Sequence, residues 1–140
     1  MRRWTLLVLP LVVASAAACG SNEATVGPEQ HRSTQASATD LTVSVTAKPG
    51  AKPREWTLKC DPPGGSHPDA KKACAALAKA KSPFKATPKN RMCTQIFGGP
   101  QQAKIDGTWH GAKVDATYSR KNGCEIDRWN AIRTVLNQKT

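Results

Sequence analysis

Histidine is the side chain most often used for proton transfer in catalysis, and this chain has three: His31, His67 and His110. His31 lies in a segment rich in Ser and Gln, while His67 and His110 lie in turns that contain glycine. None has a carboxylate or a nucleophile at a spacing that indicates a charge-relay arrangement. Ser66, His67 and Asp69 are close in sequence, but this grouping is typical of residues that cap a helix. We therefore predict that the protein is not an enzyme and needs no cofactor.

The cysteines favour disulfides over metal binding. Four of them lie in the second part of the chain and are separated by 13, 18 and 30 residues: Cys60, Cys74, Cys93 and Cys124. A structural zinc site uses short paired spacings, which this set lacks. We predict two disulfide bonds and no metal, and the residues alone leave three pairings open.

Residues 82–102 form the segment with the most distinctive chemistry. They carry prolines and two adjacent glycines without helical or strand periodicity, and long loops of this kind in a compact domain are usually functional or disordered. Within this segment, Met92 to Pro100 combines an apolar residue, a cysteine two positions before a candidate scissile-bond residue, and a Gly/Pro exit. This combination is typical of the binding loop of a small proteinase inhibitor. A surface connection without function stays open as the alternative.

The elements that must position this loop are two hairpins and two helices. Residues 41–45 and 55–60 alternate apolar and polar residues on either side of a Pro-Gly pair, as antiparallel strands do. Residues 104–109 and 112–119 alternate in the same way across a His-Gly turn. We predict one folded domain over residues 40–140. The large apolar residues that we expect in its core are Trp56, Ile105, Trp109, Val114, Tyr118, Ile126, Trp129 and Ile132.

The two predicted helices follow the strand pairs. Ser66 or Asp69 is expected to cap the first, which runs on through Ala80 with small residues on its inner face and lysines on the other. The second has apolar residues at near-helical spacing: Ile126, Trp129, Ile132 and Leu136. Acidic residues lie in its first turn and basic residues lie late, as the helix dipole favours. We predict an amphipathic helix through Lys139.

Residues 1–18 have the three parts of an export signal. Two arginines precede an apolar run over residues 6–13, and three alanines end the segment. The run is roughly half of the ~20 residues that span a bilayer, so it predicts a signal peptide and not a membrane helix. Its removal lowers the net charge from +11 to +9. A basic protein can bind nucleic acid, but no binding motif accompanies the charge, so we predict no nucleic-acid partner. Attraction to anionic cell-wall polymers or to acidic protein surfaces stays open.

Cys19 follows the three alanines, where a bacterial lipoprotein carries the cysteine that is lipidated. Lipidation would leave an even number of cysteines for disulfides. Residues 20–39 contain no Leu, Ile, Phe, Tyr or Trp and cannot form a core. We therefore predict a lipidated Cys19 and a flexible tether over residues 19–39, which hold the domain at the outer face of the cytoplasmic membrane. Ordinary cleavage near Ala18 is the alternative, and it would release a secreted protein with a free thiol.

At the loop the chain resembles the Streptomyces subtilisin inhibitor family of serine protease inhibitors. The likeness runs from about Leu41 to Cys124, and its motifs stand in the family's order: Cys60, Ser66-His67-Pro68, Cys74-Ala75-Ala76-Leu77, Met92-Cys93, Asp106-Gly107-Thr108-Trp109-His110-Gly111 and Asn122-Gly123-Cys124-Glu125. The resemblance implies an α+β fold, with an antiparallel sheet of four to five strands, two helices and two disulfides. It implies that these disulfides are Cys60–Cys74 and Cys93–Cys124, and it raises the expectation of a homodimer formed through the sheet.

The resemblance also implies the site. Gln95 becomes P1, the residue whose carbonyl a protease attacks, and Gln95-Ile96 becomes the reactive bond. The rest of the protease-binding loop is then Met92 at P4, Cys93 at P3, Thr94 at P2 and Phe97 at P2′. Gln95 offers no cation to a trypsin-like pocket, so the expected partner is a secreted subtilisin-like or broad-specificity serine protease, or one that prefers Glu or Gln.

The chain departs from the family in four places. The family usually has Pro where Thr94 stands, Met, Lys or Arg where Gln95 stands, and Asp-Pro where this chain has Gly98-Gly99-Pro100. It also has a closing strand where this chain has a helical pattern. We predict an exported inhibitor of subtilisin-like serine endopeptidases. The alternative is a cell-surface lipoprotein binding module on the same scaffold, without protease inhibition.

Overall fold

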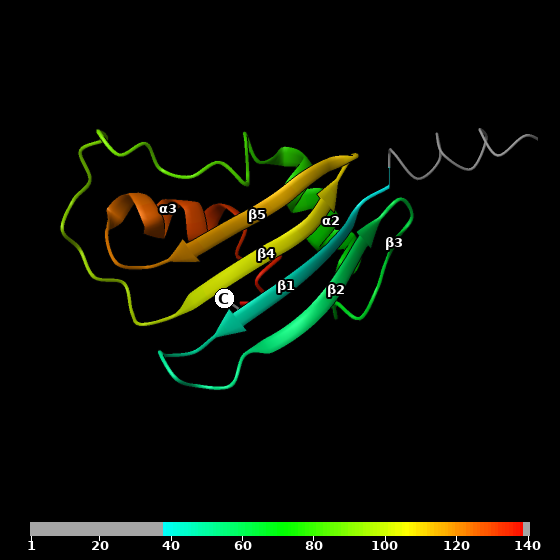
Figure 1. The fold of residues 1–140 in the computed structure, drawn as a ribbon, viewed down its shortest axis with the longest axis horizontal. Helices are drawn as coiled ribbons and strands as arrows, with labels where there is room; N and C mark the ends of the chain where they lie inside the picture. Colours follow the sequence, from blue (N-terminus) through cyan, green and yellow to red (C-terminus); the bar gives the residue numbers. More distant parts are fainter. Residues whose placement is uncertain (1–37, 139–140) are drawn as a thin grey trace, which may run out of the picture.

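The computed structural model describes residues 38–138, so the predicted signal peptide and Cys19 lie outside the described residues, as does most of the predicted tether. The described chain forms a five-stranded antiparallel sheet with two helices, which confirms the predicted α+β fold (Figure 1). The elements are β1 (Asp40–Thr46), β2 (Arg54–Cys60), β3 (Pro63–Gly64), α2 (Ala70–Lys79), β4 (Gln102–Trp109), β5 (Ala112–Ser119) and α3 (Gly123–Ala131). Neither helix is long and apolar enough to cross a bilayer within the described part of the chain.

Both predicted hairpins are present. The sheet order is β3-β2-β1-β4-β5, so β1 is central and pairs with β2 and β4. His110 and Gly111 connect β4 to β5 with φ of 46° and 82°, the left-handed conformation that a two-residue hairpin turn requires. Thr39, which we expected to be the last residue of the tether, is buried and its hydroxyl accepts a hydrogen bond from His110 N at 3.4 Å. The packed part of the chain therefore includes Thr39.

Alternating residues of the sheet form the core with both helices. The buried apolar residues are Leu41, Val43, Val45, Leu58, Ala73, Cys74, Leu77, Ala103, Ile105, Val114, Ala116, Tyr118, Trp129, Ile132, Val135 and Leu136. Full burial of one large side chain such as Leu58 stabilises a fold by about 1.5 to 3 kcal/mol. Of the predicted core residues, Trp56 and Trp109 are only half-buried at the margin of the core, and Ile126 is half-buried beside Gly98.

The start of α2 differs in part from the prediction. Asp69 is the N-cap residue, but its carboxylate pairs with Lys72 at 2.9 Å and makes no hydrogen bond to the helix backbone. The prediction of Ser66 as an alternative cap is wrong, because its hydroxyl accepts a hydrogen bond from Thr57 N at 2.9 Å and so ties the turn after β3 to β2. His67 is buried, with Nδ1 accepting from Asp69 N at 3.1 Å.

The C-terminal helix is shorter than predicted. α3 ends at Ala131, where Ile132 leaves the helical conformation with φ −120° and ψ 19°, and turns follow. Ile132, Val135 and Leu136 are nevertheless buried, and the Val135 carbonyl accepts a hydrogen bond from His67 Nε2 at 2.9 Å. These residues have the i, i+3, i+4 spacing of one helix face, so the turns bury the same apolar residues that a continued helix would have buried. No strand follows α3 within residues 132–138.

Two disulfides hold the elements together, in the pairs that the family resemblance implies. Cys60–Cys74 joins β2 to α2 with a Cα–Cα distance of 5.5 Å. Cys93–Cys124 joins the long segment between α2 and β4 to the beginning of α3, with a Cα–Cα distance of 5.4 Å. The second bridge therefore lies at the predicted loop.

Candidate functional site

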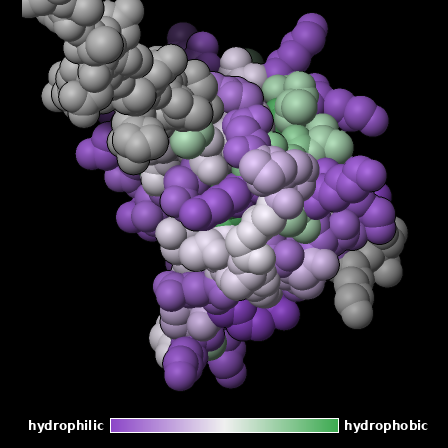
Figure 2. Space-filling view, turned by 90° about the vertical axis from the view of Figure 1, so that its right-hand side faces the viewer, coloured by the Kyte–Doolittle hydropathy of each residue, from purple (hydrophilic) through white to green (hydrophobic). Residues whose placement is uncertain are grey.

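The exposed apolar side chains lie together on the segment between α2 and β4. Among the described residues, the large hydrophobic residues that are exposed are Met92 (95%), Ile96 (60%) and Phe97 (69%). This segment runs around the beginning of α3, on the left of Figure 1. The right-hand side of that view, which faces the reader in Figure 2, is mostly hydrophilic with small hydrophobic patches. Exposed apolar clusters mark interaction surfaces, so this end of the molecule is the candidate site.

The loop is anchored before the predicted reactive bond. Thr94 O accepts a hydrogen bond from Gly123 N at 2.9 Å, beside the Cys93–Cys124 disulfide. Gly123 N belongs to the first turn of α3, whose N–H groups have no partner inside the helix, so the loop carbonyl satisfies one of them. A side chain at Gly123 would overlap Thr94 Oγ1, so glycine allows this close approach.

A second anchor follows the predicted reactive bond. Gly98 N donates a hydrogen bond to Arg120 O at 2.7 Å, and Arg120 Nη1 donates to Gln101 Oε1 at 3.2 Å. A Cβ at Gly98 would lie 2.8 Å from Ile126 Cδ1, and Gly99 has φ of 130°, where other residues are strained. The family usually has Asp-Pro where this chain has Gly98-Gly99-Pro100. The local packing requires glycine at position 98, and the backbone conformation requires it at position 99.

Residues 95–97 arch between these two anchors. Gln95, Ile96 and Phe97 are all exposed, and none of them has a positive φ. The Gln95 amide donates to Cys93 O at 3.3 Å, which is a contact within the loop itself. The exposed bond between Gln95 and Ile96 is therefore accessible while the chain on both sides of it is fixed.

Asn122 explains why the chain turns here. Its side chain caps α3 by accepting a hydrogen bond from Glu125 N at 3.0 Å. Asn is among the preferred N-cap residues, so Asn122 sets the start of the helix. The cap places Gly123 N and Cys124 at the loop.

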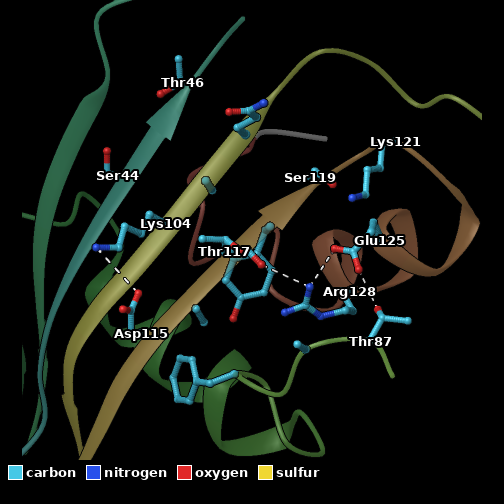
Figure 3. Close-up of a pocket in the computed structure, with 16 residues that line it drawn as sticks. Ser44, Thr46, Thr87, Lys104, Asp115, Thr117, Ser119, Lys121, Glu125 and Arg128 are labelled. Carbon is cyan, nitrogen blue, oxygen red and sulfur yellow. Dashed lines mark hydrogen bonds and ion pairs between the residues drawn. The ribbon is translucent and has the colours of Figure 1, made fainter. Parts of the chain in front are cut away.

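A polar hollow of about 560 Å³ lies beside this anchor region. Figure 3 shows Glu125 within it, between Thr87 and Arg128. Met92, Ile96 and Phe97 are not among the residues that line the hollow, so the exposed loop is a separate, protruding surface. Tyr118 also lines it, and its hydroxyl donates to Pro83 O at 2.8 Å. Burial raises the pKa of Tyr118 to about 12.

The structure brings together the predicted loop residues 92–97 and Cys124, whereas Cys60–Cys74 lies apart from them between β2 and α2. Sequence reasoning missed the supporting residues Gly123, Arg120 and Thr87, because each acts through a contact with a distant part of the chain. Within residues 38–138, no group of three His, Cys, Asp or Glu side chains could hold a metal ion.

Fold and loop together define a small disulfide-bonded domain that presents an exposed, doubly anchored segment. The family described as "Subtilisin inhibitor-like" matches residues 35–122 of the chain. The chain is 36% identical over 83 residues to "Subtilisin inhibitor-like protein 1" of Streptomyces cacaoi, covering 56% of this chain and 74% of that protein. It is 36% identical over 125 residues to the "Subtilisin inhibitor" of Streptomyces violaceus, covering 81% and 85% of the two chains.

Among solved structures, the chain is similar to Streptomyces caespitosus sermetstatin in its crystal structure with Bacillus licheniformis subtilisin. The identity is 22% and the TM-score is 0.47, with 73% of this chain and 99% of that chain covered. On the family match and the two curated relatives, this chain belongs to the subtilisin inhibitor-like family. The predicted family is thereby confirmed, and so is the prediction that the protein is not an enzyme, since the family is one of inhibitors.

Proposed function

We propose that this protein inhibits subtilisin-like serine endopeptidases, with Gln95–Ile96 as the reactive bond. The observation that carries the proposal is the exposed arch of residues 95–97 between the anchors at Thr94 and Gly98. Related proteins that carry the name subtilisin inhibitor support the same class of target.

The anchors explain how a substrate-like loop inhibits. A serine protease attacks the P1 carbonyl, here that of Gln95, and releases an amine, here that of Ile96. The Cys93–Cys124 disulfide holds the new end at Gln95, and the hydrogen bond from Gly98 N to Arg120 O holds the new end at Ile96. Both ends therefore stay in place after cleavage. Re-formation of the bond then competes with hydrolysis, and the enzyme remains occupied.

Preorganisation supplies the affinity. A loop that is already fixed loses little conformational freedom on binding, so more of its contact energy appears as binding free energy. The Cys93–Cys124 bridge, with a sequence separation of 31, also stabilises the folded state that holds the loop by roughly 3 to 4 kcal/mol, because it lowers the entropy of the unfolded chain.

The loop side chains set the specificity. Gln95 is neutral and enters the S1 pocket, so a trypsin-like enzyme with an acidic S1 pocket gains no ion pair from it. Met92 is 95% exposed at P4, where it offers an apolar side chain to the S4 pocket. The preferred targets are therefore subtilisin-like or broad-specificity proteases, or proteases that accept Gln in place of the isosteric Glu.

The protein belongs outside the cytoplasm. Two disulfides are typical of an oxidising compartment, which is consistent with an exported inhibitor. We further propose that Cys19 is lipidated and that residues 20–39 tether the domain to the membrane. Replacing Cys19 by Ala should move the protein from the membrane fraction into the medium. A homodimer through the sheet is proposed on the family resemblance, and light scattering of the purified domain tests it.

Titration of subtilisin with the purified domain tests the function. Residual activity should fall nearly linearly to zero at a molar ratio near one. Ile96→Pro, which distorts the reactive bond, should abolish inhibition, whereas Ile96→Ala keeps the main-chain N–H and should retain most of it. Full subtilisin activity at a micromolar concentration of the domain would contradict the proposal, and so would equal inhibition by the parent and by Ile96→Pro. Either result would leave a binding module on this scaffold.

A further inference from the structure

The chain that leads into the reactive loop is fixed at both ends to consecutive residues of α3. At one end, Cys93 is bonded to Cys124. At the other end, Thr87 Oγ1 donates a hydrogen bond to Glu125 Oε1 at 2.7 Å. Residues 87–93 therefore form a closed loop on the first turn of one helix, and this loop carries the exposed P4 residue Met92.

The carboxylate of Glu125 is itself held by the scaffold. Its Oε2 accepts from Arg128 Nη1 at 2.7 Å, and Arg128 Nη1 also donates to Thr117 O at 3.2 Å. The guanidinium lies 4.6 Å from the centre of the Tyr118 ring. The side chains of Glu125 and Arg128 are only 12% and 17% exposed, so water competes weakly for these charge-assisted bonds.

One carboxylate oxygen of Glu125 therefore accepts a hydrogen bond from Arg128 of the scaffold, and the other accepts one from Thr87 of the loop, as Figure 3 shows. Upstream of Thr87, the next side-chain contact to the scaffold is that of the Phe84 ring with Trp109, whose centroids lie 5.8 Å apart. Without the Thr87 contact, no side-chain contact to the scaffold would hold the chain between Phe84 and Cys93. The orientation of Met92 depends on that path, because Met92 itself is almost fully exposed.

We propose that Glu125 is a positioning residue which, through Thr87, sets the path of residues 87–92 and so presents Met92 to the S4 pocket of the protease. The proposal rests on the proposed function, since it assigns Glu125 a part in the same inhibitory loop. It adds a specificity role to a residue that the sequence pattern treats only as an acid in the first turn of a helix.

Substitutions at Thr87 test the contact while leaving the Glu125–Arg128 pair in place. Thr87→Val removes the hydroxyl but keeps the shape, and it should raise the inhibition constant for subtilisin roughly tenfold, as expected for the loss of a hydrogen bond to a charged group. Thr87→Ser keeps a hydroxyl and should inhibit within about twofold of the parent. Thr42→Val is the matched control, because Thr42 is also half-buried but lies in the central strand β1.

A double-mutant cycle with Met92→Ala separates positioning from a general loss of stability. In the parent, Met92→Ala should weaken inhibition strongly, whereas in Thr87→Val it should weaken it at least about threefold less, because Met92 is already misplaced. The Thr42→Val background should show the full effect of Met92→Ala. Urea unfolding of each variant measures stability independently.

The outcomes separate the two proposals. A parent protein that does not inhibit subtilisin overturns the proposed function, and the positioning role falls with it. A parent that inhibits, combined with a Thr87→Val variant of equal potency or an unchanged Met92→Ala effect, overturns only the role of Glu125.

Discussion

Gly123→Ala is expected to weaken inhibition while leaving the fold intact. Gly123 N donates to Thr94 O at 2.9 Å, and a Cβ at this position would overlap Thr94 Oγ1. Thr94 can relieve the overlap only by turning its side chain or by moving away from α3. Both responses displace the P2 residue next to the reactive bond.

The size of the effect follows from these two contacts. Losing the hydrogen bond costs about 1 kcal/mol net, and relieving the overlap costs about 1 to 3 kcal/mol. The free loop relaxes, and binding must restore the original geometry, so the inhibition constant increases by the same free energy. The expected increase is roughly 30-fold to 1000-fold. The free energy of unfolding should change by only about 1 kcal/mol, because Ala is the better residue in a helix.

Inhibition of subtilisin, followed with a chromogenic peptide, measures the first quantity, and urea unfolding measures the second. Thr94→Ala provides the matched rescue, since it removes Oγ1 and leaves the new Cβ about 3.4 Å from the Thr94 Cβ, which is close to ordinary contact. Gly123→Ala with Thr94→Ala should inhibit nearly as well as Thr94→Ala alone. A Gly123→Ala variant with parental potency, or one that Thr94→Ala fails to rescue, would show that this anchor does not position the loop.

Three further predictions concern the bridge, the P1 residue and pH. Replacing Cys93 and Cys124 together by Ser should convert the inhibitor into a substrate, because the cleaved ends separate; mass spectrometry should detect rapid hydrolysis by subtilisin, and persistence of the intact chain would contradict this. Gln95→Lys should create trypsin inhibition in a standard amidase assay, since Lys supplies the cation that an acidic S1 pocket needs, and no gain would argue against P1. Burial raises the pKa of Tyr118 to about 12, above its ordinary value near 10, so the folded state favours the neutral phenol. Stability should be intact below pH 10 and fall by at most about 2 to 3 kcal/mol as pH rises from 10 to 12; Tyr118→Phe should remove this component of the urea-unfolding profile, and an unchanged profile would refute it.

The sequence predicted the elements whose signal is local. The two hairpins follow from residues that alternate along each strand and from turns whose residues accept positive φ, such as Gly111. The end of α3 could not be predicted in the same way. Apolar spacing continues to Leu136, but the chain leaves the helix at Ile132 and buries Val135 through a contact with His67, which lies far away in sequence.

The same distinction applies to the candidate site. The sequence placed the loop and its cysteine, since composition and motif order are visible along the chain. The anchors were not visible, because Gly123 and Thr94 lie in different segments and glycine in a turn has many uses. Glu125 was correctly expected in the first turn of a helix, but its contact with Thr87 depends on how the loop folds back.

The fate of the Gln95–Ile96 bond during prolonged incubation tests the central claim most directly. Mass spectrometry should find a lasting mixture of intact chain and chain cleaved only at this bond, while subtilisin stays inhibited and Cys93–Cys124 holds the fragments together. Complete degradation with recovery of protease activity, or cleavage at a different bond, would contradict the account of an anchored loop that can be cut and rejoined.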